Sequence, residues 1–148
     1  MKHKKILLVE DNPDDEALTL RALKKSNFAN NIFVVRDGVE AIEYLFNEGS
    51  FAGSEVRDLP QVVLLDLNLP KLGGLGVLRR IREDPRTRLL PVVILSSSDE
   101  DLDRIQSYSL GANSYVRKPV DFEQFLKAAA QLGLYWLVLN EPPLPVAS

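Results

Sequence analysis

Short apolar runs that end in charged side chains are the most constraining feature of this sequence. Continuous apolar runs are typical of parallel strands that are buried on both faces of a sheet. The charged residues that follow them are Glu10 and Asp11 after Ile6–Val9, Asp66 after Val62–Leu65, and Lys118 with Pro119 shortly after Tyr115 and Val116. Because α/β proteins place their chemistry at the carboxyl ends of parallel strands, we expect these groups to share one sheet edge.

Five strand-like runs alternate with segments of helical periodicity. The predicted strands are Lys4–Val9, Asn31–Arg36, Gln61–Asp66, Pro91–Ser96 and Ser114–Val116. The predicted apolar helix sides are Ala17, Leu20 and Leu23 within Asp14–Ser26; Val39, Ile42, Leu45 and Phe46; Leu75, Leu78 and Ile81; Leu102, Ile105 and Leu110; and a last helix from Asp121. Right-handed crossovers then predict a doubly wound, flavodoxin-like α/β/α fold, with a five-stranded parallel sheet in the order 2-1-3-4-5.

The length predicts a single domain. The chain has 148 residues, of which 45% are hydrophobic, and we expect one domain over 1–148 with an extension after about residue 140. Residues 48–60 are rich in Gly, Ser and charge and predict a long surface loop. The last helix is apolar on more than one face, which fits either a homodimer interface or a better-covered core.

Composition narrows the classes of partner. A net charge of −3 argues against direct binding of nucleic acid, which requires clustered cations. The chain contains no cysteine, which is consistent with a cytoplasmic location, and the run Ile6–Val9 is too short for a signal-peptide core. No stretch approaches the roughly 20 apolar residues of a membrane span.

The clustered acids predict a magnesium site. Mg²⁺ prefers oxygen ligands and is often held by one or two carboxylates together with a phosphate. Asp11 and Asp66 fit this role. The Glu10 side chain is one methylene longer and is expected to reach a metal-bound water, and the backbone carbonyl of Asn68 lies on the loop just past Asp66. Without a cation these acids repel one another.

The same residues predict phosphoryl chemistry. A carboxylate can attack phosphorus and form an acyl phosphate when cations neutralise the transferring oxygens. Asp66 is the better candidate nucleophile because it ends the central strand, and Lys118 can supply the cation. Ser96 can offer its hydroxyl group to a phosphoryl oxygen, although a shift of register would give this role to Ser97 or Ser98.

Together these motifs resemble the receiver domain of two-component response regulators. The matching residues are the acidic pair Glu10-Asp11, the turn Asp66–Pro70, the hydroxyl residue Ser96, and Tyr115 with Lys118-Pro119. The resemblance spans about residues 4–139. It implies that Asp66 accepts a phosphoryl group from a histidine kinase, that Ser96 and Tyr115 act as switch residues, and that the Lys118–Pro119 peptide bond is cis.

Other features point to a narrower group within this family. The loop at 48–60, the segment Tyr135–Leu137 and the proline-rich tail resemble stand-alone regulators paired with phytochrome-type kinases. The signal is then expected to leave through changed partner binding at a surface of the fourth helix, fifth strand and fifth helix. Three departures from the family pattern are Glu10 for aspartate, Gly73 where an aspartate is frequent, and Ser97 after Ser96.

Each motif also has a structural interpretation. Glu10 and Asp11 could be acids at a helix start, Asp66–Pro70 could be only a turn, and Tyr115 could be core. His3 is expected to be idle, and Gly73–Gly76 lacks the spacing of a nucleotide loop. The arginines at 79, 80, 82, 86 and 88 are expected to form a solvated helix face.

Three other functions compete with the receiver hypothesis. A magnesium-dependent phosphohydrolase also uses an aspartyl nucleophile, but Asn68 stands where it would need a second acid. A flavin carrier is disfavoured because the acids of 10–15 would repel a cofactor phosphate. A pure interaction scaffold would have no chemical need of Asp11, Asp66 and Lys118.

Overall fold

The computed structural model describes residues 5–25, 32–49, 59–97, 101–118 and 123. Several predictions concern residues outside these ranges, namely those for His3, Ser98, most of the 48–60 loop, the Lys118–Pro119 bond, the last helix and the tail. The described elements are β1 (Ile6–Val9), α1 (Pro13–Lys25), β2 (Ile32–Val35), α2 (Gly38–Phe46), β3 (Val62–Asp66), α3 (Gly74–Glu83), β4 (Val92–Ser96), α4 (Asp101–Ser109) and β5 (Ser114–Arg117).

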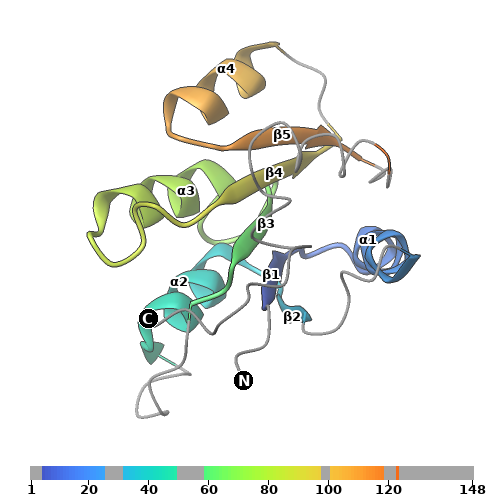
Figure 1. The fold of residues 1–148 in the computed structure, drawn as a ribbon, viewed down its shortest axis with the longest axis horizontal. Helices are drawn as coiled ribbons and strands as arrows, with labels where there is room; N and C mark the ends of the chain where they lie inside the picture. The colour runs from blue at the N-terminus through green and yellow to red at the C-terminus, as the bar shows by residue number, and fades with distance from the viewer. Residues whose placement is uncertain (1–4, 26–31, 50–58, 98–100, 119–122, 124–148) are drawn as a thin grey trace, which may run out of the picture.

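The strands form one parallel sheet in the order β2-β1-β3-β4-β5, which confirms the predicted fold (Figure 1). Val9 pairs with Leu65 across β1 and β3, and Leu95 pairs with Val116 across β4 and β5. The chain moves outward from β1 to β2 and then returns past β1 to β3. This reversal places the crevice used by α/β proteins at the carboxyl ends of β1 and β3.

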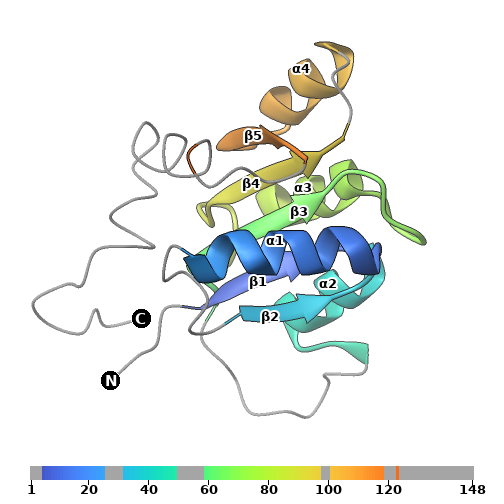
Figure 2. The same cartoon turned by 90° about the vertical axis from the view of Figure 1, so that its right-hand side faces the viewer.

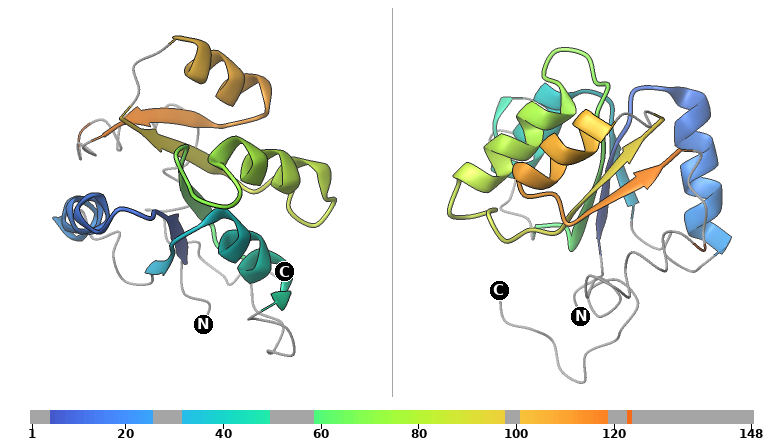
Figure 3. Two further views of the ribbon diagram at one scale, coloured as in Figure 1. Left: turned by 180° about the vertical axis from the view of Figure 1, so that it is seen from behind. Right: turned by 90° about the horizontal axis from the view of Figure 1, so that it is seen from above.

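Both faces of the sheet are covered by helices. Helix α1 lies across one face, whereas α2, α3 and α4 lie on the opposite side (Figures 2 and 3). Side chains alternate between the two layers: Leu7 and Val9 join the core under α2 and α3, and Ile6 and Leu8 join the core under α1. Because both faces are buried at the centre of the sheet, β1, β3 and β4 are apolar up to Val9, Leu65 and Leu95, and each fully buried Leu or Ile contributes about 1.5–3 kcal/mol.

The buried face of α1 differs from the predicted one. Leu23 is buried and Leu20 packs against the core as expected, but Ala17 is exposed, and Thr19 and Ala22 are buried as well. The buried positions follow the i, i+3, i+4 spacing of a helix face. The prediction for Ala17 was wrong because this face is rotated toward Thr19.

The predicted apolar sides of the second and fourth helices are confirmed in part: Leu45 and Phe46 are buried, and Ile42 and Leu110 pack against the core. Val39 is 40% exposed, and Ala41 and Tyr44 are buried in α2. In α4, Ile105 is 61% exposed, and Ser107 is buried. The Ser107 hydroxyl group donates a hydrogen bond to the Asp103 carbonyl at 2.8 Å, which satisfies its polar atom in the interior.

Arg82 does not belong to a solvated helix face. Its Nε donates to the carbonyl of Gly111 at 2.9 Å, and its Nη1 donates to the carbonyls of Arg88 and Leu90 at 3.0 and 2.6 Å. Its Nη2 donates to Oδ1 of Asn113 at 2.9 Å. Partial burial lowers the pKa of its guanidinium. Arg82 therefore ties the end of α3 to the turns that precede β4 and β5.

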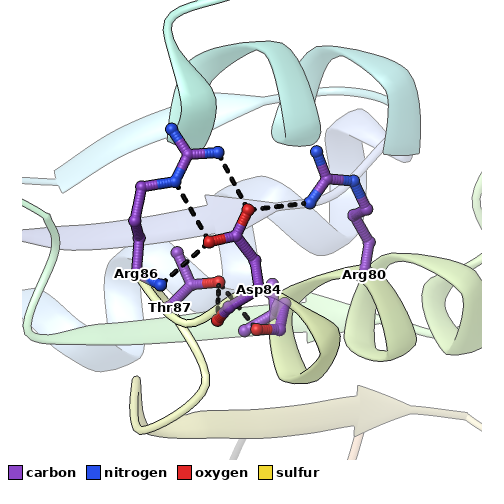
Figure 4. A network of polar contacts seen from close by, with 5 residues as sticks. Arg80, Asp84, Arg86 and Thr87 are labelled. Carbon is purple, nitrogen blue, oxygen red and sulfur yellow. Dashed lines mark hydrogen bonds and ion pairs between the residues drawn. The ribbon is translucent and has the colours of Figure 1, made fainter.

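The turn after α3 is held by a second polar network (Figure 4). The Asp84 carboxylate accepts hydrogen bonds from Arg86 and from Arg80, the closest to Arg86 Nη2 at 2.8 Å. Arg86 holds the pKa of Asp84 well below its usual value. Thr87 is buried, and its hydroxyl group donates to the Ile81 carbonyl at 2.6 Å. These contacts stabilise the turn that follows α3, which lies away from the acidic cluster.

Candidate functional site

The turn between β1 and α1 shapes one wall of the site. Oδ1 of Asn12 accepts hydrogen bonds from the backbone N–H groups of Asp14 at 2.9 Å and Asp15 at 3.1 Å. Asn12 is thus the N-cap of α1, and Pro13 occupies the first helical position, where its missing N–H is not needed. The cap places the acids of the first turn above the carboxyl edge of the sheet.

Strand alternation brings Glu10, Asp66 and Lys118 to the same side. Asp66 ends β3, and Glu10 and Lys118 lie immediately beyond β1 and β5. Each of the three follows the alternation of residues that point toward α1, such as Leu8 on β1 and Val116 on β5. The three side chains therefore converge beneath the first turn of α1.

Lys118 lies at the centre of this group. Its Nζ is 2.6 Å from Oε1 of Glu10, 3.0 Å from Oδ2 of Asp15 and 3.3 Å from Oδ2 of Asp66. The Lys118 side chain is only 7% exposed and that of Glu10 is fully buried. One ammonium group thus faces three carboxylates away from bulk water.

Asp15 is the member of this group that the sequence interpretation missed. The first turn of α1 contains Asp14, Asp15 and Glu16, which fit the general preference for acids at a helix N-terminus. That preference does not distinguish among the three. The sequence nevertheless indicated that one of these acids could lie near Glu10, because the helix that follows β1 must begin above the edge of the sheet where Glu10 lies.

The acids are also held by the backbone of their own loops. The Asn68 N–H donates to Oδ1 of Asp66 at 3.3 Å, and the Asn12 N–H donates to Oε2 of Glu10 at 3.3 Å. Asn68 itself is exposed. Both oxygens of Asp66 therefore have a polar neighbour, Oδ1 on its own loop and Oδ2 at Lys118.

Burial sets the electrostatics of the site. Burial raises the pKa of Glu10 to about 7, because it outweighs the opposing contact with Lys118 and is reinforced by Asp66. Burial alone would lower the pKa of Lys118, but its contacts with Glu10 and Asp15 and the charge of Asp66 raise it instead. Lys118 therefore remains a cation at neutral pH.

The acids fit a divalent cation. One oxygen each from Glu10, Asp11 and Asp66 can be chosen so that all three lie within 4.8 Å of one another. Glu10 and Asp66 are buried, whereas Asp11 is exposed, so the cluster opens toward solvent on the Asp11 side. An all-oxygen donor set suits Mg²⁺ and other hard cations.

Gly74 lets the loop after β3 pack closely on the site. A Cβ at this position would collide with the Asp66 carbonyl oxygen and would lie 2.7 Å from Cα of Leu67. The Gly74 N–H also donates to the Leu67 carbonyl at 3.0 Å. The glycine run noted in the sequence therefore includes one position where close backbone approach excludes a side chain.

On the β4–β5 side of the site, Ser96 lies next to Lys118, whereas Tyr115 lies in the opposite layer of the sheet. Ser96 ends β4 and is fully buried, whereas Ser97 is exposed. The Ser96 carbonyl accepts a hydrogen bond from the Lys118 N–H at 2.8 Å, so the two residues are neighbours. Tyr115 is partly buried and packs against the core under α2 and α3.

A doubly wound parallel sheet that carries clustered acids and a buried lysine at its carboxyl edge defines an α/β domain with a charged site at its topological switch point. The chain belongs to the response regulator receiver domain family, whose profile matches residues 6–130. This family membership does not favour the phosphohydrolase alternative. Among the described residues, no helix is long and apolar enough to span a bilayer.

Two curated relatives match almost the whole chain. FilR2 of Methanothrix harundinacea, named as a probable methanogenesis regulatory protein, is 42% identical over 95% of this chain and 88% of its own. Response regulator Rcp1 of Synechocystis is 37% identical over 90% of this chain and 89% of its own.

Three similar solved structures extend this comparison. The bacteriophytochrome response regulator RtBRR is 52% identical, with a TM-score of 0.82 over 96% of this chain and 85% of its own. The phosphorylated cyanobacterial phytochrome response regulator RcpA is 40% identical, with a TM-score of 0.75 over 98% of this chain and all of its own. The Mn²⁺-bound form of Rcp1 is 35% identical, with a TM-score of 0.74 over 97% of this chain and all of its own.

Proposed function

We propose that this receiver domain accepts a phosphoryl group on Asp66 from a histidine kinase of the phytochrome type and signals through changed partner binding. The observation that carries the proposal is the position of Asp66, whose Oδ2 lies 3.3 Å from the buried ammonium group of Lys118 and whose carboxylate belongs to the Glu10–Asp11 cluster. The names of RtBRR and RcpA support the phytochrome pairing, and the phosphorylated state of RcpA supports the chemistry.

In the proposed step, an Asp66 carboxylate oxygen attacks the phosphorus of the donor. A P–O bond forms, the bond between phosphorus and the donor nitrogen breaks, and the electron pair leaves with the donor imidazole. Lys118 stays protonated throughout and neutralises charge on the phosphoryl oxygens. The Asn68 N–H orients Asp66, and the proposed role of the Ser96 hydroxyl group is to donate to a phosphoryl oxygen from the β4 side.

Glu10, Asp11, Asp66 and the carbonyl of Asn68 are the proposed ligands of Mg²⁺. When bound, this ion neutralises charge on the transferring phosphoryl group. The Mn²⁺-bound form of Rcp1 supports a divalent ion in this family. The contribution of the protein is to hold its acids close together despite their repulsion, with Lys118 as the resident counter-charge.

The output surface is proposed to include α4. Ile105 is 61% and Tyr108 is 48% exposed on this helix, and exposed apolar side chains of this size suit a partner contact. Phosphorylation draws Ser96 and Lys118 toward Asp66, and these residues end β4 and follow β5, beside α4. Tyr115 is the proposed second switch residue because it lies on β5 within the adjoining core.

Phosphorylation can be tested by incubating the protein with Mg²⁺ and acetyl phosphate. Intact mass should increase by one phosphoryl group, and borohydride reduction followed by peptide mapping should locate it at Asp66. The Asp66→Asn variant and a sample treated with EDTA should stay unlabelled, whereas Asp37→Asn should label normally. Undiminished labelling of Asp66→Asn would refute the assignment.

The kinase and the assembly need separate experiments. Phosphotransfer profiling against the histidine kinases of the source organism should identify a phytochrome-type donor, and rapid transfer from a kinase of another class would contradict this pairing.

The cytoplasmic location and the homodimer through the C-terminal helix are also part of the proposal. Sedimentation velocity should detect the dimer, and a monomer at high concentration in both phosphorylation states would exclude it.

A further inference from the structure

Three carboxylates share the Lys118 ammonium group, and they differ in how easily they can leave it. Glu10 is completely buried, and the Asp66 side chain is only 6% exposed. The Asp15 side chain is 34% exposed and lies on the first turn of α1. Asp15 can therefore rotate into water, where its carboxylate is solvated, whereas a Glu10 carboxylate separated from Lys118 would stay buried without a partner.

A phosphoryl group on Asp66 would compete for the N–H donors of Lys118. An ammonium group has three N–H donors, and Nζ of Lys118 lies within 3.3 Å of one oxygen from each of three carboxylates, with a hydrogen bond to Oδ2 of Asp15. A phosphoryl oxygen on Asp66 needs one of these donors. The Asp15 contact is the exchangeable one because its carboxylate is the most exposed of the three.

Asp15 also adds negative charge where a phosphoryl donor must approach. Asp15 Oδ2 lies 3.0 Å from Nζ, and Nζ lies 3.3 Å from Asp66, so the Asp15 charge is within a few ångströms of the reacting carboxylate. Like charges at such separations repel strongly in a partly buried site. Charge repulsion by Asp15 and its competition for Lys118 therefore both oppose phosphorylation of Asp66.

We propose that Asp15 is a positioning residue that holds Lys118 in the unphosphorylated protein and is displaced by the phosphoryl group. This inference rests on the proposed phosphorylation of Asp66. The Asp15–Lys118 pair stabilises the unphosphorylated state, so its loss on phosphorylation opposes the reaction. The same exchange releases the first turn of α1 from the sheet edge, which couples phosphorylation to the start of this helix.

The test measures phosphorylation by low concentrations of acetyl phosphate and the affinity for beryllofluoride, a phosphoryl mimic, in saturating Mg²⁺. Asp15→Asn should phosphorylate faster and bind beryllofluoride more tightly by about threefold to fivefold, the size expected for a partly exposed ion pair. Asp15→Ser, which is also neutral and favourable near a helix start, should behave in the same way. Asp15→Glu should stay close to wild type because it retains the charge.

Asp14→Asn is the matched control. It removes the same charge from the same turn, but Asp14 is exposed and its backbone N–H has the same cap as that of Asp15. A gain by Asp15→Asn no larger than that of Asp14→Asn, or slower phosphorylation of both neutral variants, would overturn the proposal. A wild-type protein that is not labelled at Asp66 would instead refute the proposed function, so the two failures are distinguishable.

Discussion

Nζ of Lys118 lies 2.6 Å from Oε1 of Glu10, and both side chains are almost completely removed from solvent. A buried ion pair of this kind contributes little net stability, because desolvation of both charges offsets their attraction. Removal of either partner is nevertheless costly. The pair therefore serves to keep a cation at the carboxyl edge of β3.

The raised pKa of Glu10 predicts a pH-dependent stability. The unfolded chain releases the Glu10 proton near the ordinary pKa of 4.5, whereas the folded protein holds it up to about pH 7. The folded state then binds more protons across this window, so the stabilisation is complete below pH 4.5 and is lost as pH rises through 7. Glu10→Gln has no such proton, so its stability relative to wild type should increase from pH 5 to pH 8.

Urea unfolding of both proteins without divalent ions measures this difference. Glu83→Gln, an exposed glutamate at the end of α3, should follow wild type at both pH values. A constant gap between Glu10→Gln and wild type would contradict the assignment of the pKa shift to Glu10.

Replacement of Lys118 should make stability depend strongly on Mg²⁺. Lys118→Met leaves Glu10 and Asp66 facing each other without a cation, which should cost about 3 kcal/mol at pH 8. Mg²⁺ should then raise the melting temperature of the variant more than that of wild type. Lys71→Met is the control, since the Lys71 side chain is 67% exposed and its pair with Asp37 should contribute less than about 1 kcal/mol. If Mg²⁺ raised the melting temperatures of Lys118→Met and wild type equally, this result would contradict the proposed Mg²⁺ site.

Arg82 should be the arginine of α3 on which stability depends most. Arg82→Met leaves the carbonyls of Gly111, Arg88 and Leu90 without this donor and should cost about 3 kcal/mol. The exposed Arg79 offers a comparison on the same helix, and Arg79→Met should change the free energy of unfolding by less than about 0.5 kcal/mol. Similar losses for the two variants would show that the Arg82 contacts are dispensable.

Substitution by alanine should destabilise the protein at Gly74 but not at Gly73. In Gly74→Ala the new Cβ meets backbone at Asp66 and Leu67, and this clash should exceed the roughly 1 kcal/mol that alanine gains within a helix. We expect a net loss of about 2 kcal/mol and slower labelling of Asp66. In Gly73→Ala the nearest atom is 3.9 Å away, so stability and labelling should be retained, and a tolerated Gly74→Ala would show that the loop can move.

Much of this architecture was predictable because it depends on strand order and side-chain alternation. The apolar runs before Glu10 and Asp66 indicated parallel strands, and parallel strands necessarily align their carboxyl ends. The sheet order was also confirmed, because right-handed crossovers between parallel strands restrict the possible orders. The placement of Lys118 beside these acids follows from the same alternation along β5.

The features that were not predicted depend on tertiary packing, which the periodicity of the sequence does not determine. Ala17 and Ile105 have the spacing of core residues, yet the rotation of each helix on the sheet leaves them exposed. Arg82 looked like its solvated neighbours because its acceptors come from loops distant in sequence. Asp15 was overlooked because its partner is supplied by the opposite end of the chain.

Because side chains alternate between the two faces along β1, β3 and β5, the site should tolerate a changed apolar residue in these strands better than a changed strand length. Leucine, isoleucine and valine can replace one another in these strands at modest cost, since either core layer accepts them. A one-residue insertion before Glu10 would instead swing its carboxylate to the opposite layer of the sheet. Length changes within these strands should therefore abolish phosphoryl acceptance in variants that still fold, whereas conservative core substitutions should leave it intact.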